Sequence, residues 1–183
     1  MSNAAFMMVA FANPAIVGAV CPSSRWLAAA MAAAAQGARL LVELGAGTGA
    51  ITEALLAQHP QVPLLAVELQ PELADLLQQR FAGIEVRCAG AHDVLSELHE
   101  QSPPQTVLVS SLPFQSLPAP WRENTVQAIA TFLRADKLRR LVQYTYGQKA
   151  PFELAADSEL CWRRVGRVWR NAPPASVWSL QRH

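Results

Sequence analysis

At residues 40–49 the sequence reads Leu-Leu-Val-Glu-Leu-Gly-Ala-Gly-Thr-Gly, a short apolar run that ends in three alternating glycines. The run from Leu40 to Leu44 predicts a buried strand, and a helix is predicted from Ala50 to His59. Glycines between them let the backbone turn tightly and let a ligand approach where a side chain would collide. The N-terminus of the helix favours anionic groups. The stretch therefore predicts a ligand-binding turn between a strand and a helix.

The same alternation of strand and helix continues on both sides of this turn. Ser23 or Ser24 is expected to cap a first helix that runs to about Gln36 and stops at Gly37. The other predicted helices cover residues 71–81, 93–100 and 121–133. The apolar stripe of the last helix consists of Val126, Ile129, Ala130 and Leu133. The other predicted parallel strands cover residues 64–69, 84–88, 106–112 and 138–146.

The C-terminal residues break the alternation. Strands are predicted over 160–170 and 176–181, joined by the turn at 171–174. An antiparallel hairpin would then close a five-stranded parallel sheet. The predicted fold class is α/β, with a mostly parallel seven-stranded sheet and helices on both faces, in one domain over residues 1–183. This is the Rossmann-like architecture of class I methyltransferases.

The glycine turn alone is compatible with two cofactors. Gly45, Gly47 and Ala50 also satisfy the spacing of the dinucleotide fingerprint. Glu68 ends the second predicted strand, where a carboxylate can accept both ribose hydroxyls in either case. The acidic Glu43 inside the first strand is typical of methyltransferases and would be odd in a dehydrogenase. No Tyr-x-x-x-Lys pair is present, and the chain is too short for a second catalytic domain. We therefore expect an S-adenosylmethionine-dependent methyltransferase.

The segment after the fourth predicted strand reads Ser110-Ser111-Leu112-Pro113-Phe114. Methyltransferases that act on amino groups place Asn or Asp here, then two residues and often an aromatic ring that stabilises developing positive charge. Because Ser replaces Asn or Asp, the motif of nucleic-acid amine methylation is absent. Pro113 and Phe114 can equally end the strand and pack in the core, and both interpretations remain open.

The first 24 residues carry no charged side chain. A basic region of the kind that begins a signal peptide is absent, and Pro14, Gly18 and Pro22 interrupt the apolar stretch short of the roughly 20 residues that a membrane span needs. The expectation is a cytoplasmic protein.

The three cysteines, Cys21, Cys88 and Cys161, are far apart in the sequence and form no Cys-x-x-Cys or Cys/His cluster. We expect reduced thiols, no structural disulfide and no metal site.

Charge is divided unevenly along the chain. Residues 1–121 hold 4 basic and 9 acidic side chains, whereas residues 122–183 hold 11 and 5. The basic C-terminal third suits an anionic partner, either lipid head groups or nucleic acid, or is simply a solvated face.

Several stretches give the chain a resemblance to the bacterial phospholipid N-methyltransferases, whose core is similar to that of the rRNA adenine dimethylases. The matching stretches are residues 18–25, the glycine turn with Ile51-Thr52, Ser111-Leu112-Pro113, residues 143–147 and residues 167–178. The resemblance implies stepwise methylation of phosphatidylethanolamine towards phosphatidylcholine at the membrane surface.

The resemblance also implies roles for individual residues. Glu43, Gly45, Gly47 and Gly49 would bind the methionine part of the cofactor, and Glu68 would bind its ribose. The full set expected at the cofactor is Glu43, Gly45, Ala46, Gly47, Gly49, Glu68, Leu69, Ala91, His92, Asp93 and Ser110. The expected catalytic residues are Ser111, Tyr144 and Tyr146, the two tyrosines to orient the amine or relay its proton, with core packing as the alternative.

The chain departs from the family pattern at two places. Where the family has Gly-Asp-Ala after the third strand, this chain reads Ala89-Gly90-Ala91, so Asp93 either replaces the adenine contact or caps the next helix. His92 is expected as a solvated neighbour rather than a base. The N-terminal segment also lacks the basic residues that are common in the family, since the first charge is Arg25.

The expected partner is a phospholipid or another small amine. Residues 1–36, an apolar segment followed by a helix, are expected to cover the cofactor site, and residues 6–22 to make weak, mostly hydrophobic contact with the inner face of the membrane. The alternatives are a methyltransferase for another small or lipophilic acceptor and a cofactor-binding protein without catalysis. An rRNA adenine N6-methyltransferase is a further alternative, but nucleic acid is not the expected partner because the amine motif and an added helical domain are missing.

Overall fold

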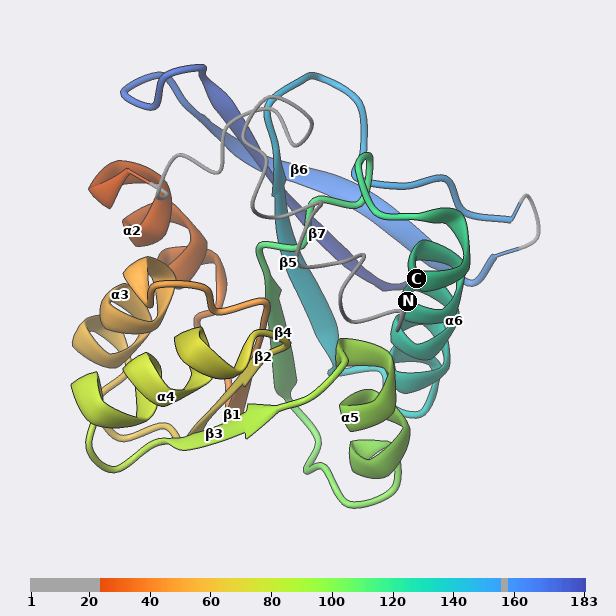
Figure 1. The fold of residues 1–183 in the computed structure, drawn as a ribbon. Coiled ribbons are helices and arrows are strands. Elements are labelled where there is room, and N and C mark those ends of the chain that lie inside the picture. Colours follow the sequence, from red (N-terminus) through yellow and green to blue (C-terminus); the bar gives the residue numbers. More distant parts are fainter. Residues whose placement is uncertain (1–23, 156–157) are drawn as a thin grey trace.

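A seven-stranded sheet forms the centre of the molecule, with strand order β3-β2-β1-β4-β5-β7-β6 (Figure 1). The computed structural model describes residues 24–155 and 158–183. The first five strands are parallel, and β7 pairs antiparallel with both β5 and β6. The strands are β1 (Leu40–Leu44), β2 (Leu64–Glu68), β3 (Glu85–Cys88), β4 (Thr106–Ser110), β5 (Arg140–Thr145), β6 (Leu160–Val168) and β7 (Ala175–Arg182). The predicted fold class and sheet are confirmed.

Helices cover both faces of the sheet (Figure 1). One face carries α2, α3 and α4, and the other carries α5 and α6, and a separate buried apolar cluster fills the space on each side. The helices are α2 (Arg25–Ala34), α3 (Ala50–Gln58), α4 (Pro71–Arg80), α5 (Ala91–Leu98) and α6 (Ala119–Arg134). The side chain of Ser24 accepts a hydrogen bond from the Leu27 N–H and so caps α2, as predicted.

Alternation along β1 explains how one strand serves both clusters. Leu41 belongs to the cluster under α2 and α3, whereas Val42 and Leu44 belong to the cluster under α5 and α6. Successive side chains of a strand point to opposite faces, so Glu43 lies on the same face as Leu41, beneath α3. A buried apolar strand thus carries one carboxyl group into the protein interior.

Two helices differ from the prediction. α5 begins at Ala91 instead of Asp93, so that Gly90 is the N-cap and Asp93 is the third helical residue. A carboxylate in the first turn is still favoured by the helix dipole. α6 buries Phe132 and Thr125 in addition to Ile129 and Leu133, while the predicted Val126 and Ala130 are only half-buried. The apolar face of α6 is therefore rotated from the predicted stripe, towards the larger Phe132 side chain.

The hairpin of β6 and β7 is joined to the start of α2. The Ser24 N–H donates to Asn171 Oδ1 at 3.3 Å, and Asn171 Nδ2 donates to the Pro173 carbonyl at 2.7 Å. Asn171 is buried. A shift of register interrupts the pairing of β6 with β7 between Arg164 and Gly166. The turn of the hairpin therefore lies against the helix N-terminus.

The apolar part of the predicted cover over the cofactor site, and with it the membrane contact of residues 6–22, falls on residues 1–23, which lie outside the described residues. Both stay predictions. The helix of the predicted cover is α2, which packs against α3 in the apolar cluster on that face of the sheet. Within the described residues, no helix is long and apolar enough to cross a membrane.

Leu108 lies in the middle of β4 with 0% of its surface exposed. We expect Leu108→Ala to lower the free energy of unfolding by about 2–5 kcal/mol, because it removes buried methyl groups and leaves a cavity. The matched control is Leu138→Ala, whose side chain is 54% exposed, with an expected change within about 0.5 kcal/mol. Urea unfolding followed by circular dichroism measures both, and equal losses would contradict this description of the core.

Candidate active site

The carboxyl ends of the parallel strands meet at one edge of the sheet. β1 lies between β2 and β4, so the chain leaves β1 and β4 in opposite directions across the sheet. A crevice at such a switch point is the usual ligand site of open α/β sheets. Glu43, Glu68 and Ser110 come to this edge from three neighbouring strands.

The glycine turn is fastened to the end of β2. The N–H groups of Gly45 and Ala46 donate to the Val67 carbonyl at 2.8 and 3.1 Å, and the Gly47 N–H donates to Glu68 Oε2 at 2.8 Å. Gly47 has φ +57°, and a Cβ at this position would meet no protein atom within 4 Å. Gly47 therefore presents backbone that no described side chain covers, whereas Leu112 lies against Gly45.

Glu68 is buried, with 6% of its surface exposed. Its second oxygen, Oε1, accepts the Gln70 N–H at 3.0 Å. A carboxylate has about four acceptor sites, so two backbone donors leave room for two more hydrogen bonds. Glu68 is therefore a buried carboxyl group rather than a solvated residue at the strand end.

Glu43 is the most deeply buried carboxyl group of the edge, at 1% exposure. Thr52 Oγ1, in the first turn of α3, donates to Glu43 Oε2 at 2.7 Å, whereas Oε1 is buried with no partner. The pKa of the Glu43 carboxyl is raised to about 8, mainly because the group is buried; the hydrogen bond from Thr52 lowers the pKa, and the nearby charge of Glu68 raises it. Thr52 was not among the predicted site residues; a hydroxyl in the first helical turn after the glycines is the signal that points to it.

Other residues expected at the cofactor have packing roles in this structure. Gly49 has φ +86°, and a Cβ there would lie 2.5 Å from the Phe81 ring, so α3 and α4 require a glycine at this position. Ala46 is buried and Leu69 is half-buried beside Glu68.

Ser110 and Ser111 hold the segment that follows β4. The buried Ser110 Oγ accepts the Leu112 N–H at 3.2 Å. The Ser111 N–H donates to the Leu44 carbonyl at 3.1 Å, and its hydroxyl donates to the Gly45 carbonyl. The hydroxyl of Ser111 therefore joins this segment to the glycine turn.

Phe114 lies in the core rather than at the crevice. It is 3% exposed, and its ring centroid is 4.8 Å from that of Phe152. Of the two interpretations left open by the sequence, the structure favours packing for Phe114.

Gln143 was not predicted as a site residue. It is 2% exposed in β5, and its Nε2 donates to the Leu112 carbonyl at 3.2 Å and to the Tyr144 carbonyl at 3.0 Å. A polar side chain in a central parallel strand is the sequence signal for it, since such strands are otherwise apolar. Gln143 fixes the segment after β4 from the side opposite to Ser111.

Tyr144 and Tyr146 lie at the end of β5 in contact with each other. Their ring centroids are 5.5 Å apart with the planes at 70°, an edge-to-face arrangement. Tyr144 is half-buried against the cluster under α2 and α3, and Tyr146 is 38% exposed. Both predicted tyrosines thus reach the same edge as the glycine turn.

Ala91, His92 and Asp93 form the first turn of α5, next to the end of β3. The His92 ring meets Trp121 edge to face at 5.1 Å, and its Nε2 lies 3.5 Å from Asp93 Oδ1. The Asp93 side chain is 62% exposed. Because Gly90 is the N-cap, the alternative that Asp93 caps this helix does not hold.

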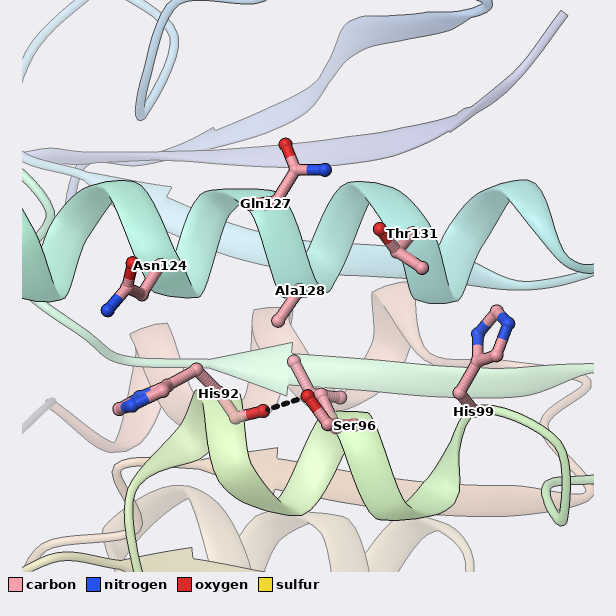
Figure 2. Close-up of a pocket in the computed structure, with 8 residues that line it drawn as sticks. His92, Ser96, His99, Asn124, Gln127, Ala128 and Thr131 are labelled. Carbon is pink, nitrogen blue, oxygen red and sulfur yellow. Dashed lines mark hydrogen bonds between the residues drawn. The ribbon is translucent and has the colours of Figure 1, made fainter.

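A groove of about 380 Å³ runs between α5 and α6 (Figure 2). Its lining residues are His92, Leu95, Ser96, His99, Asn124, Gln127, Ala128 and Thr131. The groove shares only His92 with the predicted site residues. No residue of the glycine turn lines this groove, so we do not assign the cofactor to it.

A family model described as a methyltransferase domain matches residues 41–136, which is more than half of the chain. This chain belongs to the S-adenosylmethionine-dependent methyltransferases. The matched region begins in β1 and ends just after α6, so it contains the glycine turn, Glu68 and the segment after β4.

Related sequences agree with this membership. An ornithine lipid N-methyltransferase from Singulisphaera acidiphila is 30% identical over 92% of this chain and 90% of its own length. A ribosomal RNA small subunit methyltransferase A from Burkholderia ambifaria is 41% identical over 44% of this chain and 31% of its own length.

Solved structures share the fold. The magnesium protoporphyrin IX methyltransferase from Synechocystis PCC 6803, solved with bound S-adenosylmethionine, has a TM-score of 0.65 at 10% identity and covers 100% of this chain and 98% of its own. The cofactor of the methyltransferase described here is S-adenosylmethionine. The residues at this edge suit the cofactor, because the open backbone of Gly47, two buried carboxyl groups and the N-terminus of α3 lie at the same edge of the sheet.

The raised pKa of Glu43 makes stability depend on pH. The folded state binds this proton up to about pH 8, whereas the ordinary value is 4.5. Below about pH 4.5 both the folded and the unfolded state hold this proton, so the free energy of unfolding is not reduced. As the pH rises the unfolded state loses the proton first, and the free energy of unfolding falls by about 3 kcal/mol at pH 7. We expect Glu43→Gln to remove this decline. Urea unfolding of both proteins between pH 4.5 and 8 measures the difference, and parallel curves would show that Glu43 is ionised throughout.

Proposed function

We propose that this methyltransferase N-methylates the primary amine in the head group of a membrane lipid, phosphatidylethanolamine in the first place. The observation that carries the proposal is the lipid N-methyltransferase from Singulisphaera acidiphila, which matches the chain over nearly the full length of both proteins. That relative also makes ornithine lipid the second candidate acceptor. Both lipids present a primary amine close to phosphate or carboxyl groups at the membrane surface.

The residues after β4 support a lipid amine over an RNA base. Ser111 stands where enzymes acting on nucleic-acid amines have Asn or Asp, and its hydroxyl is directed to Gly45. The ribosomal RNA methyltransferase relative is matched over only 31% of its length. The chain thus shares the cofactor half of such enzymes and lacks their acceptor motif.

The proposed cofactor contacts follow from the placement of the residues. Gly45, Ala46 and Gly47 would receive the methionine part at the start of α3, with Glu43 beneath them. Glu68 would bind the ribose hydroxyls with its two remaining acceptor sites. Leu69 with Ala91, His92 and Asp93 would enclose the adenine, while Ser110 would shape the floor of the crevice and Gly49 the first turn of α3.

Catalysis would depend on alignment. When bound, the cofactor supplies an electrophilic methyl group, so the protein has to orient the amine and exclude water. An amine attacks only in its neutral form. Tyr144 and Tyr146 would orient the amine or relay its proton from the end of β5, and Ser111 and Gln143 would hold the segment that faces it. Membrane contact of residues 6–22 would bring the lipid to this edge.

Glu68→Ala should weaken binding of S-adenosylmethionine by roughly ten- to several-hundred-fold, because charge-assisted hydrogen bonds contribute about 1.5–3 kcal/mol each. The variant also loses the hydrogen bond between Glu68 and the Gly47 N–H, so we expect a loss of affinity near the upper end of this range. Isothermal titration measures the affinity. Glu72→Ala, which removes an exposed carboxylate from the first turn of α4, is the control, and equal affinities of the two variants would contradict the ribose assignment.

The acceptor is tested by methyl transfer from labelled cofactor to vesicles. We expect product with phosphatidylethanolamine in phosphatidylcholine vesicles and none with phosphatidylcholine alone. Ornithine lipid and an unmodified RNA that contains adenine loops form the other two arms. Transfer to RNA with none to either lipid would overturn the proposal.

Replacing both Tyr144 and Tyr146 by phenylalanine should reduce methyl transfer to the lipid without weakening cofactor binding.

A further inference from the structure

The exposed aromatic side chains of the described residues gather at one end of the molecule. Trp26, Tyr146 and Trp169 are 40%, 38% and 69% exposed. Trp26 lies in the first turn of α2, Tyr146 follows β5, and Trp169 begins the turn between β6 and β7. In Figure 1 this turn projects past the sheet beside the start of α2. Soluble surfaces seldom place large aromatic rings together without a partner.

Arginines surround the two tryptophans. The guanidinium groups of Arg25 and Arg170 lie 4.8 and 4.7 Å from the centre of the Trp26 ring. The guanidinium of Arg167 lies 4.2 Å from the centre of the Trp169 ring. We call Arg25, Trp26, Arg167, Trp169 and Arg170 the Trp/Arg surface.

The charges of the Trp/Arg surface are not neutralised. Among the described residues, Arg25, Arg167 and Arg170 form no ion pair with an acidic side chain. Arg25 and Arg170 are exposed, and Arg167 is half-buried. Such guanidinium groups are available to anionic oxygens, which they bind through paired hydrogen bonds.

The Trp/Arg surface lies at the same edge as the candidate active site. β7 runs antiparallel to β5, with Thr145 opposite Ser176, so the hairpin turn lies beyond the end of β5. Ser176 Oγ donates to the Gly147 carbonyl at 2.8 Å, and Trp178 Nε1 donates to Thr145 Oγ1 at 3.1 Å. These bonds connect the hairpin to the segment that carries the two tyrosines.

We propose that the Trp/Arg surface docks the enzyme on an anionic phospholipid bilayer. Tryptophan rings suit the interfacial layer of a membrane, where one edge meets apolar chains and the N–H meets water or ester oxygens. The arginines are attracted to lipid phosphates and to the negative potential of the leaflet. This inference rests on the proposed function. Docking at this edge would let a lipid head group reach the ends of β4 and β5 while the acyl chains of the lipid stay in the bilayer.

Vesicle binding of the full chain tests the surface without requiring turnover. Co-sedimentation is measured with vesicles of phosphatidylcholine alone and of equal parts phosphatidylcholine and phosphatidylglycerol. We expect tighter binding to the anionic vesicles, weakened by added salt. Replacing Arg167 and Arg170 by alanine should weaken it by roughly fivefold per charge. Trp169→Ala should weaken it by about tenfold.

The controls are Arg134→Ala, an exposed arginine at the far end of α6, and Leu138→Ala beside it. Both should bind vesicles as the unaltered protein does, and cofactor affinity and thermal midpoint should be unchanged in the Trp/Arg variants. Arginine variants that bind anionic vesicles normally would overturn the proposal. So would arginine-dependent binding of a single-stranded RNA without vesicle binding, or a dimer that Trp169→Ala dissociates. Vesicle binding without lipid methylation would support the surface and contradict the proposed acceptor.

Discussion

β1 is hydrogen-bonded in parallel to β2 on one side and to β4 on the other, and the site depends on this central position. The glycine turn that leaves β1 is held from both neighbours: Val67 and Glu68 at the end of β2 accept its N–H groups, and Ser111 after β4 donates to its carbonyl. A turn with three glycines in five residues makes few side-chain contacts of its own. It keeps its shape because two strands that are fixed by the sheet hold it in place.

The two carboxyl groups of the edge are buried by different means. Each oxygen of the Glu68 carboxyl group accepts a hydrogen bond from a backbone N–H group. Glu43 has one hydroxyl partner and an oxygen without any, so the protein interior favours its neutral form. If only stability mattered, an apolar side chain of similar size would suit this buried position better than a carboxyl group. Its presence beneath the glycine turn therefore points to a role in binding.

The sequence predicts the elements well where periodicity is local. β1 has the predicted bounds because five apolar or buried residues run directly into Gly45, and α2 starts after the predicted Ser24 cap. The start of α5 was missed because Gly90 gives no capping signal through a side chain. Individual side-chain contacts between distant segments could not be predicted. The carbonyl that Gln143 holds and the ring that Arg170 covers belong to elements far away in the chain.

Within residues 24–155 and 158–183, β6 is one of the two outer strands of the sheet and has no partner on its outer edge, and such an edge invites pairing with another chain. The register shift between Arg164 and Gly166 breaks the regular row of backbone donors and acceptors there, and Arg163, Arg164 and Arg167 add like charges along the strand. Two copies brought together edge to edge would face a distorted ladder and repulsion. We therefore expect the irregular strand to hinder the addition of a second copy to this edge of the sheet, even at high local concentration.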